Sequence, residues 1–241
     1  MSRNKVYFVA DIHLGLDAND PAAREERFVQ WLRDINTPET KAVWLLGDIW
    51  DFWYEYRDVM PREAFRAAAQ ISNLLDAGIE VNYIPGNHDI WLYSFWQKLG
   101  VRVLVQPQAV ELGGRRFLLG HGDGLGGAAF GYRLMLRIFH SRVCQVLFNQ
   151  LHPWIAFRFG TDWSNNNRRK HGGYHFRGAE EPLYKYCVGY GPGADFFIFG
   201  HFHDAVDTVL PTGARLIVLK DWIGDPQPHF ACWDGENLTV Q

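Results

Sequence analysis

Trp44-Leu45-Leu46-Gly47-Asp48 is a short apolar run that stops abruptly at a carboxylate. The run from residue 42 to residue 46 is typical of a strand buried on both faces, and it is short for a helix. Gly47 allows the backbone a sharp exit, so we expect Asp48 at the carboxyl end of the strand, where open α/β sheets place their ligands. Taken alone, a glycine and an aspartate after a strand indicate only a turn.

Polar residues follow four other strand-like segments in the same way. They are Asp11 and His13 after residues 6–10, Asn87 and His88 after residues 81–84, His121 after residues 117–119, and His201 and His203 after residues 196–199. A single Gly-Asn-His-Asp loop is more often a turn, since Asn and Asp favour turns. Five such pieces together, offering carboxylate, amide and imidazole donors, favour a site for divalent ions such as manganese, iron or zinc.

The number of donors predicts two metal ions. The seven candidate ligands are Asp11, His13, Asp48, Asn87, His121, His201 and His203. If Asp48 is shared, each ion has four protein ligands and keeps positions for water or substrate. Two ions roughly 3.5–4 Å apart lower the pKa of a bound water and clamp a phosphoryl group. We interpret His88 as a catalytic-site residue that either supports the metal ligands from outside their shell or acts as an acid near the leaving group, with Asp89 orienting it.

The order of the predicted elements indicates the fold. Strand-like residues 6–10, 42–46 and 81–84 alternate with two amphipathic segments, one starting at Asp20-Pro21 and one at Pro61. This rhythm predicts right-handed crossovers and a largely parallel sheet. Hairpin-like segments follow, with glycine turns at residues 113–114 and 211–213. We therefore expect two sheets packed face to face with outer helices.

A different region lies between residues 125 and 191. Met135, Phe139, Val143 and Val146 fall on one helical face, and a polar, basic run follows at residues 165–170. An insertion this long between two ligand-bearing strands is either a lid or a dimerisation element. Asn165, Arg168 and Lys170 are our candidate substrate contacts, and Arg168, Arg169 and Lys170 are the candidates to contact a diphosphate. A solvated surface face is the alternative interpretation of this run.

Composition limits the kinds of partner. The 241 residues carry a net charge of −3, which argues against a nucleic-acid-binding protein. The three cysteines have no pairing pattern, which suits a reducing compartment. No stretch approaches the ~20 apolar residues needed to cross a bilayer, and the first residues lack the apolar core of a signal peptide. We therefore expect a soluble or peripheral protein in the cytoplasm.

The five motifs, taken in order, resemble those of the calcineurin-like metallophosphoesterase superfamily. They are Asp11-Ile12-His13, Gly47-Asp48, Gly86-Asn87-His88-Asp89, Gly120-His121 and Gly200-His201-Phe202-His203. The resemblance implies a four-layer α/β/β/α sandwich of the α/β (α+β) class, as a single domain over residues 1–241 with a helical insertion at about 125–191. It also implies the ligand sets, which are Asp11, His13, Asp48 and His203 for one ion and Asp48, Asn87, His121 and His201 for the other.

Within that superfamily, the chain is most similar to the UDP-2,3-diacylglucosamine diphosphatases of lipid A biosynthesis. The points of likeness are Gly120-His121-Gly122-Asp123, Gly131-Tyr132, Pro153-Trp154 and the stretch from residue 219 to residue 222. The similarity implies a pyrophosphate hydrolase that uses two manganese ions. The substrate would be a nucleotide-linked acylated sugar, and the products UMP and 2,3-diacylglucosamine 1-phosphate. It further implies peripheral association with the inner membrane, and it leaves the oligomeric state open.

Two other functions remain open. Enzymes of that lipid A family carry Arg where this chain has His88, which general phosphoesterases of the superfamily use. A phosphatase or phosphodiesterase with a small soluble substrate is therefore the alternative, with the insertion as a dimer contact. A non-catalytic scaffold is disfavoured because every ligand position is intact.

Overall fold

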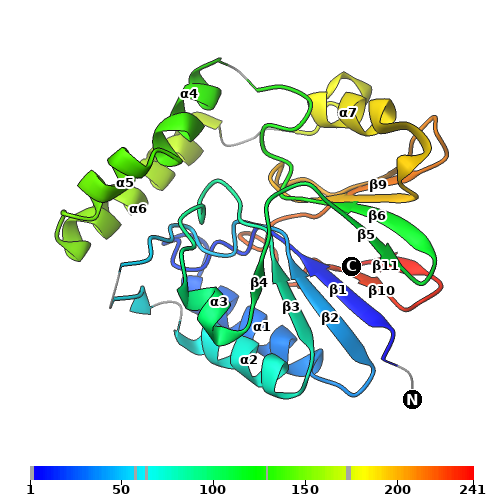
Figure 1. Cartoon of the computed structure of the whole chain (residues 1–241), viewed down its shortest axis with the longest axis horizontal. Helices are drawn as coiled ribbons and strands as arrows, with labels where there is room; N and C mark the ends of the chain where they lie inside the picture. Colours follow the sequence, from blue (N-terminus) through cyan, green and yellow to red (C-terminus); the bar gives the residue numbers. More distant parts are fainter. Residues whose placement is uncertain (1–2, 57–58, 63–64, 129, 172–174) are drawn as a thin grey trace.

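Two sheets packed face to face form the centre of the protein, with helices outside both (Figure 1). The structure, a computed structural model, describes residues 3–56, 59–62, 65–128, 130–171 and 175–241, without the side chains of residues 166–171. Helices α1 and α2 cover the outer face of the first sheet, and α7 covers the second (Figure 1). The predicted four-layer α/β/β/α sandwich is confirmed.

The first sheet has six strands in the order β11-β10-β1-β2-β3-β4. Strands β1, β2, β3 and β4 are parallel, and β10 and β11 extend the sheet antiparallel beyond β1. The strands span Lys5–Val9 (β1), Thr40–Leu45 (β2), Glu80–Tyr83 (β3), Arg102–Val103 (β4), Ala231–Trp233 (β10) and Leu238–Val240 (β11). The helices between them are α1 (Pro21–Asp34), α2 (Phe65–Asp76) and α3 (Phe95–Leu99).

The second sheet has five strands in the order β5-β6-β7-β9-β8. Strands β6, β7 and β9 are parallel, while β5 and β8 form antiparallel hairpins at the two edges, as the glycine turns predicted. The strands span Gln108–Leu112 (β5), Arg115–Leu119 (β6), Phe196–Phe199 (β7), Val206–Val209 (β8) and Arg215–Val218 (β9). Helix α7 spans Pro182–Tyr190 and buries Leu183 and Cys187 against this sheet.

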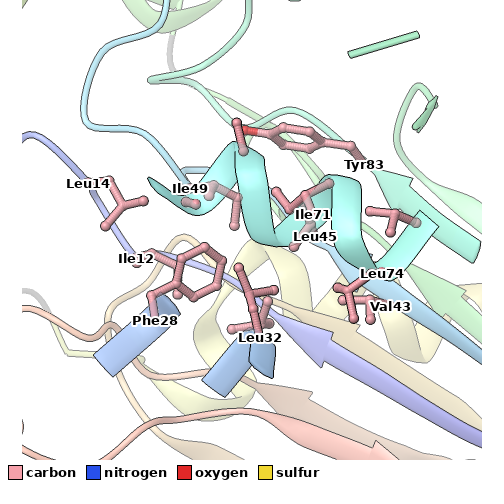
Figure 2. Packing of buried hydrophobic residues seen from close by; sticks show 14 of the residues in the cluster. Ile12, Leu14, Phe28, Leu32, Val43, Leu45, Ile49, Ile71, Leu74 and Tyr83 are labelled. Atoms are coloured by element: carbon pink, nitrogen blue, oxygen red, sulfur yellow. The ribbon is translucent and has the colours of Figure 1, made fainter. Parts of the chain in front are cut away.

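Alternation along the central strands separates two apolar layers. In β2, Val43 and Leu45 face the helices, where they pack with Phe28 and Leu32 of α1 and with Ile71 of α2 (Figure 2). The residues of the other face lie between the sheets. Strands of this first sheet are therefore apolar on both faces, as expected for parallel strands covered on both sides. Such burial fixes where each strand ends, and so where the polar residues after it lie.

Three helices of the predicted insertion project to one side of the two sheets (Figure 1). They are α4 (Phe130–Phe139), α5 (Arg142–Phe148) and α6 (Pro153–His171). The single helical face expected from Met135 to Val146 is wrong, because Ser141 starts a new helix with its hydroxyl accepting from the N–H of Cys144. Val146 is consequently 61% exposed.

Aromatic side chains attach this helical group to the loops at the strand ends. The hydroxyl of Tyr54 donates to the carbonyl of Gln145 at 2.9 Å, and the indole of Trp91 donates to the carbonyl of Phe139 at 3.0 Å. The rings of Tyr54 and Phe148 have centroids 4.7 Å apart. The segment from Trp50 to Tyr56 thus supports the helical group, and its two tryptophans also lie in the core.

Candidate metal centre

All seven predicted ligands lie where strands of the two sheets end. Four follow β1, β2 and β3 of the first sheet, namely Asp11, His13, Asp48 and Asn87. Three follow β6 and β7 of the second sheet, namely His121, His201 and His203. Five of the seven have a positive φ between 51° and 73°; these are Asp11, His13, Asp48, His201 and His203. Non-glycine residues rarely adopt this conformation, and it is concentrated at functional sites.

Short distances join the side chains from the two sheets. His13 Nε2 lies 3.3 Å from His203 Nε2, and His203 Nε2 lies 3.6 Å from Asp11 Oδ1. On the other side, His121 Nε2 lies 3.3 Å from Asp48 Oδ2. His13 Nε2 lies 3.9 Å from the same Asp48 oxygen, so the Asp48 carboxylate stands between the two groups. This is the position that a shared ligand requires.

In three of the candidate histidines, Nδ1 lies close to an acceptor oxygen on the side away from the cluster. His13 Nδ1 lies 3.3 Å from Asp51 Oδ1, His121 Nδ1 lies 2.9 Å from the carbonyl oxygen of Leu46, and His203 Nδ1 lies 3.3 Å from Asp221 Oδ2. An Nδ1–H that donates to such an acceptor leaves the lone pair on Nε2. In the neutral form of each imidazole, Nε2 is therefore the nitrogen available to a metal ion.

The cluster fits divalent cations. Among the described residues, Asp11 Oδ1, Asn87 Oδ1 and His121 Nε2 are buried without a hydrogen-bond partner, which is costly unless a cation is coordinated there. Burial opposes the charged form of His121, but the Asp48 and Asp11 carboxylates raise the pKa of this imidazole well above its ordinary value. The centre therefore attracts positive charge. Its oxygen and nitrogen donors suit borderline or hard metal ions.

His201 differs in its electrostatics. Burial and the neighbouring His121 lower the pKa of His201 to about 4, so this imidazole is neutral at physiological pH. Its ring centroid lies 5.1 Å from that of His121. Its backbone N–H donates to Asp11 Oδ2 at 2.8 Å, which ties the loop after β7 to the loop after β1. A neutral imidazole is the form that binds a metal.

His88 lies beside the cluster. Its backbone N–H donates to Asp48 Oδ1 at 2.9 Å, and its Nε2 lies 3.9 Å from Asp48 Oδ2. Its Nδ1 lies 2.8 Å from the carbonyl oxygen of Asp51. The ring of Trp163 on α6 contacts the His88 ring, with centroids 5.7 Å apart. His88 is thus in the place for a group that meets a bound phosphoryl oxygen, between the metal cluster and the helical group.

The partner of His88 was not identified correctly from sequence. Asp89 accepts hydrogen bonds from the N–H groups of Ile49 and Gly86 and from the hydroxyl of Tyr83, so it joins the loops after β2 and β3. Burial and the Asp48 charge raise the pKa of Asp89 to about 6. The residue beside the His88 and His13 rings is Asp51. Its position three residues after Asp48, in the same strand-end loop, is the signal that could have identified it.

Two glycines allow the strand-end loops to approach each other. A Cβ on Gly86 would collide with Asp48 Oδ1 and would lie 2.7 Å from the Asp48 backbone nitrogen. A Cβ on Gly200 would collide with Asp11 Oδ2. Both glycines belong to the motifs identified in the sequence. Their role is close packing of backbone against a ligand carboxylate.

Asp123 links the loop that carries His121 to the helical group. The hydroxyl of Tyr132 on α4 donates to Asp123 Oδ2 at 2.9 Å, and Gln106 Nε2 donates to Asp123 Oδ1 at 2.5 Å. The predicted substrate contacts lie only partly within the described residues. Asn165 is half-buried on α6, while the side chains of Arg168 and Lys170 lie outside the described residues.

A two-sheet sandwich with carboxylate, amide and imidazole donors at its strand ends defines a metal-dependent phosphoesterase. The model of the calcineurin-like phosphoesterase family matches residues 4–205. The chain belongs to this family and is an enzyme, a hydrolase that works with divalent metal ions.

Individual relatives show which members of this family the chain is similar to. The chain is 34% identical to a UDP-2,3-diacylglucosamine hydrolase from Porphyromonas gingivalis, over 99% of this chain and 97% of the relative. It is 28% identical to one from Actinobacillus succinogenes, over 91% and 92% of the two chains. Among solved structures, a dimetal phosphatase from Danio rerio shares the fold with a TM-score of 0.52 at 18% identity, covering 96% of this chain and 92% of that one.

Proposed function

We propose that this protein hydrolyses the pyrophosphate bond of UDP-2,3-diacylglucosamine in lipid A biosynthesis. The products are UMP and 2,3-diacylglucosamine 1-phosphate. The observation that carries the proposal is the close approach of Asp11, His13, Asp48, His121 and His203 at the strand ends of two sheets. The chain is also similar over its whole length to a hydrolase named for this substrate. Support for a lipid substrate comes from the aromatic-rich helical group beside the centre.

The residues divide the chemistry among them. Asp11, His13, Asp48 and His203 would hold one ion, and Asp48, Asn87, His121 and His201 the other, with manganese the proposed metal. Two divalent ions in such a site supply a nucleophilic water at neutral pH and neutralise the charge of a phosphoryl group. His88 faces the substrate side of Asp48 and stabilises the leaving or equatorial oxygens by donating a hydrogen bond. The ring of Trp163 packs against the His88 ring and would restrict its orientation.

The helical group supplies the contact with lipid. Apolar side chains on α4, α5 and α6 are strongly exposed, and they include Phe130, Leu134, Ile138, Val143, Val146, Leu147, Trp154, Ile155 and Phe159. Arginines 133, 137, 142 and 158 lie on the same helices. Exposed apolar residues with interspersed cations favour an anionic membrane surface. We place the enzyme in the cytoplasm, at the inner membrane; in the described part of the chain, no helix is long and apolar enough to span a bilayer.

A direct assay tests the proposal. Purified protein with added Mn²⁺ is offered UDP-2,3-diacylglucosamine in mixed micelles and, separately, a generic phosphodiester. We expect UMP release to exceed phosphodiester hydrolysis by orders of magnitude in kcat/KM. Absence of UMP release by protein that contains two manganese ions would contradict the proposed substrate while leaving the metal centre intact.

One observation favours the alternative function. His88 is built firmly into the centre, through Asp48 and Asp51, as a residue of general phosphoesterases would be. A phosphodiesterase with a small soluble substrate would have similar kcat/KM values with and without detergent micelles. An enzyme for an acylated substrate would take up detergent or co-purify with lipid on its helical group.

A further inference from the structure

Asp221 is a partly buried carboxylate that touches the candidate metal centre but does not belong to the predicted ligand set. It lies after β9, with its side chain 14% exposed. Its Oδ2 lies 3.3 Å from Nδ1 of His203, and its Oδ1 accepts a hydrogen bond from the N–H of Ile223 at 2.7 Å. One oxygen is therefore fixed by the backbone, and the other faces the outer nitrogen of a candidate ligand.

His203 depends on this contact more than the other two anchored histidines do. The side chains of His13 and His121 are completely buried, so neighbouring groups restrict their rings from all sides. The side chain of His203 is 33% exposed. Packing therefore restrains the His203 ring less than the rings of His13 and His121, although it contacts the His13 ring at a centroid distance of 5.0 Å. The Asp221 carboxylate supplies a further restraint on its orientation and tautomer.

The segment that carries Asp221 is itself rigidly held. The N–H of Trp222 donates to the carbonyl oxygen of Asp11 at 3.1 Å, and the Trp222 side chain is completely buried against Phe28 and Trp31 of α1. On the other side, Lys220 pairs with Asp225 at 2.9 Å. A single short segment thus touches Asp11 through its backbone and His203 through a carboxylate, and both are candidate ligands of the same ion.

We propose that Asp221 is a positioning residue that holds His203 Nε2 toward the metal ion shared with Asp11 and His13, and that it acts on this ion selectively. Among the described residues, Asp221 forms no hydrogen bond or ion pair with Asn87, His121 or His201, which are assigned to the other ion. The inference rests on the metal centre proposed above. Loss of an outer carboxylate partner typically weakens metal binding 10–100-fold.

The test measures metal affinity directly. Protein freed of metal with a chelator is titrated with Mn²⁺, and free Mn²⁺ is followed by electron paramagnetic resonance in the wild type, Asp221→Asn and Asp225→Asn. Asp225 is the matched control, because it lies in the same segment and pairs with Lys220 and His229. We expect two sites in the wild type and the control. We expect Asp221→Asn to keep one site unchanged and to bind at the other 10–100-fold more weakly.

A kinetic measurement accompanies the titration. Asp221→Asn should need more Mn²⁺ for half-maximal activity, while kcat at saturating Mn²⁺ stays within a few fold of the wild type. Two unchanged sites in Asp221→Asn, or equal weakening in both variants, would overturn the inference and leave the proposed function standing. A wild type that binds no Mn²⁺ would overturn both. If Asp221→Asn does not fold, Asp221→Ser replaces it, and unchanged affinity at both sites then counts against the inference.

Discussion

The ring of Trp163, on a helix of the insertion, lies against the ring of His88, with centroids 5.7 Å apart. The insertion therefore reaches the residue that we assign to catalysis. A cover for lipid chains alone would not require this contact. Together with the hydrogen bond from Tyr132 to Asp123, it joins the helical group to both sides of the metal centre.

Replacement of Trp163 should impair the chemical step. We expect Trp163→Leu to lower kcat about 10–100-fold, because a small displacement of a catalytic group has effects of this size. Trp154→Leu is the control, since Trp154 is on the same helix and is 63% exposed. Both variants are assayed with the diacylated substrate and with a generic phosphodiester. Equal activities in the two variants would show that the contact with His88 has no catalytic role.

Loss of a ligand in the centre should abolish turnover. Asp48→Ala removes the carboxylate between the two groups of donors, and His121→Ala removes an imidazole of one group. We expect both to lose at least about 10³-fold in kcat, since the two metal ions act as a unit. Circular dichroism should be unchanged. Turnover near the wild-type rate in either variant at saturating Mn²⁺ would refute the two-metal assignment.

Metal removal should lower thermal stability. The buried carboxylates of Asp11 and Asp48 repel each other unless a cation lies between them. A ligand at a hundred times its Kd stabilises the folded state by about 2.7 kcal/mol, which for a chain of this length raises Tm by about 5–10 °C. Thermal unfolding with Mn²⁺ and with EDTA measures the difference. Identical Tm values would mean that the centre binds no Mn²⁺ in the folded state.

Two glycines should respond in opposite directions to the same substitution. Gly86→Ala forces a methyl group against Asp48 and should destabilise the fold by about 1–3 kcal/mol and weaken Mn²⁺ binding. Gly189→Ala is the control in helix α7, where a Cβ meets nothing within 4 Å, and it should stabilise by about 0.5–1 kcal/mol. Denaturant unfolding and Mn²⁺ titration separate the two effects. Normal Mn²⁺ affinity in Gly86→Ala would show that the loop can shift without cost to the centre.

Charge placed on the helical group should reduce membrane binding. Val146 and Leu147 of α5 are 61% and 65% exposed, and the double change to Glu adds two negative charges to an apolar face. We expect at least tenfold less co-sedimentation with vesicles that contain anionic lipid, since each residue loses apolar burial and meets like charge. Val209→Glu, on an exposed position of β8, should bind as the wild type does. Equal binding by all three proteins would exclude α5 from the membrane contact.

The sequence predicted the sandwich because each central strand is a short apolar run with a polar residue within three positions of its end. Burial on both faces determined the strand, and the end of the apolar run located the candidate ligand, as at Leu46 and Asp48. The hairpins were predictable from their glycine turns. Contacts between segments that are distant in the chain were not predictable, since local patterns do not show which loops lie side by side.

The partners of the ligands illustrate that limit. The carbonyl of Leu46 holds His121, although 75 residues separate them in the chain. Asp221 lies beside His203 only because β9 pairs with β7. Asp89 seemed from sequence to be the partner of the adjacent His88, whereas the folded chain turns it toward backbone N–H groups of two loops. In the insertion, the break at Ser141 was hidden because residues on both sides of it are apolar at helical spacing.

The candidate ligands come from both sheets, four from the first sheet and three from the second. A metal ion with ligands from both sheets would link segments as distant in the chain as Asp11 and His203. Severing the polypeptide between β4 and β5 would therefore leave two pieces, each with an incomplete coordination shell. Their reassociation would depend on the supply of metal. The same ions would then supply the chemistry of this enzyme and hold its two halves together.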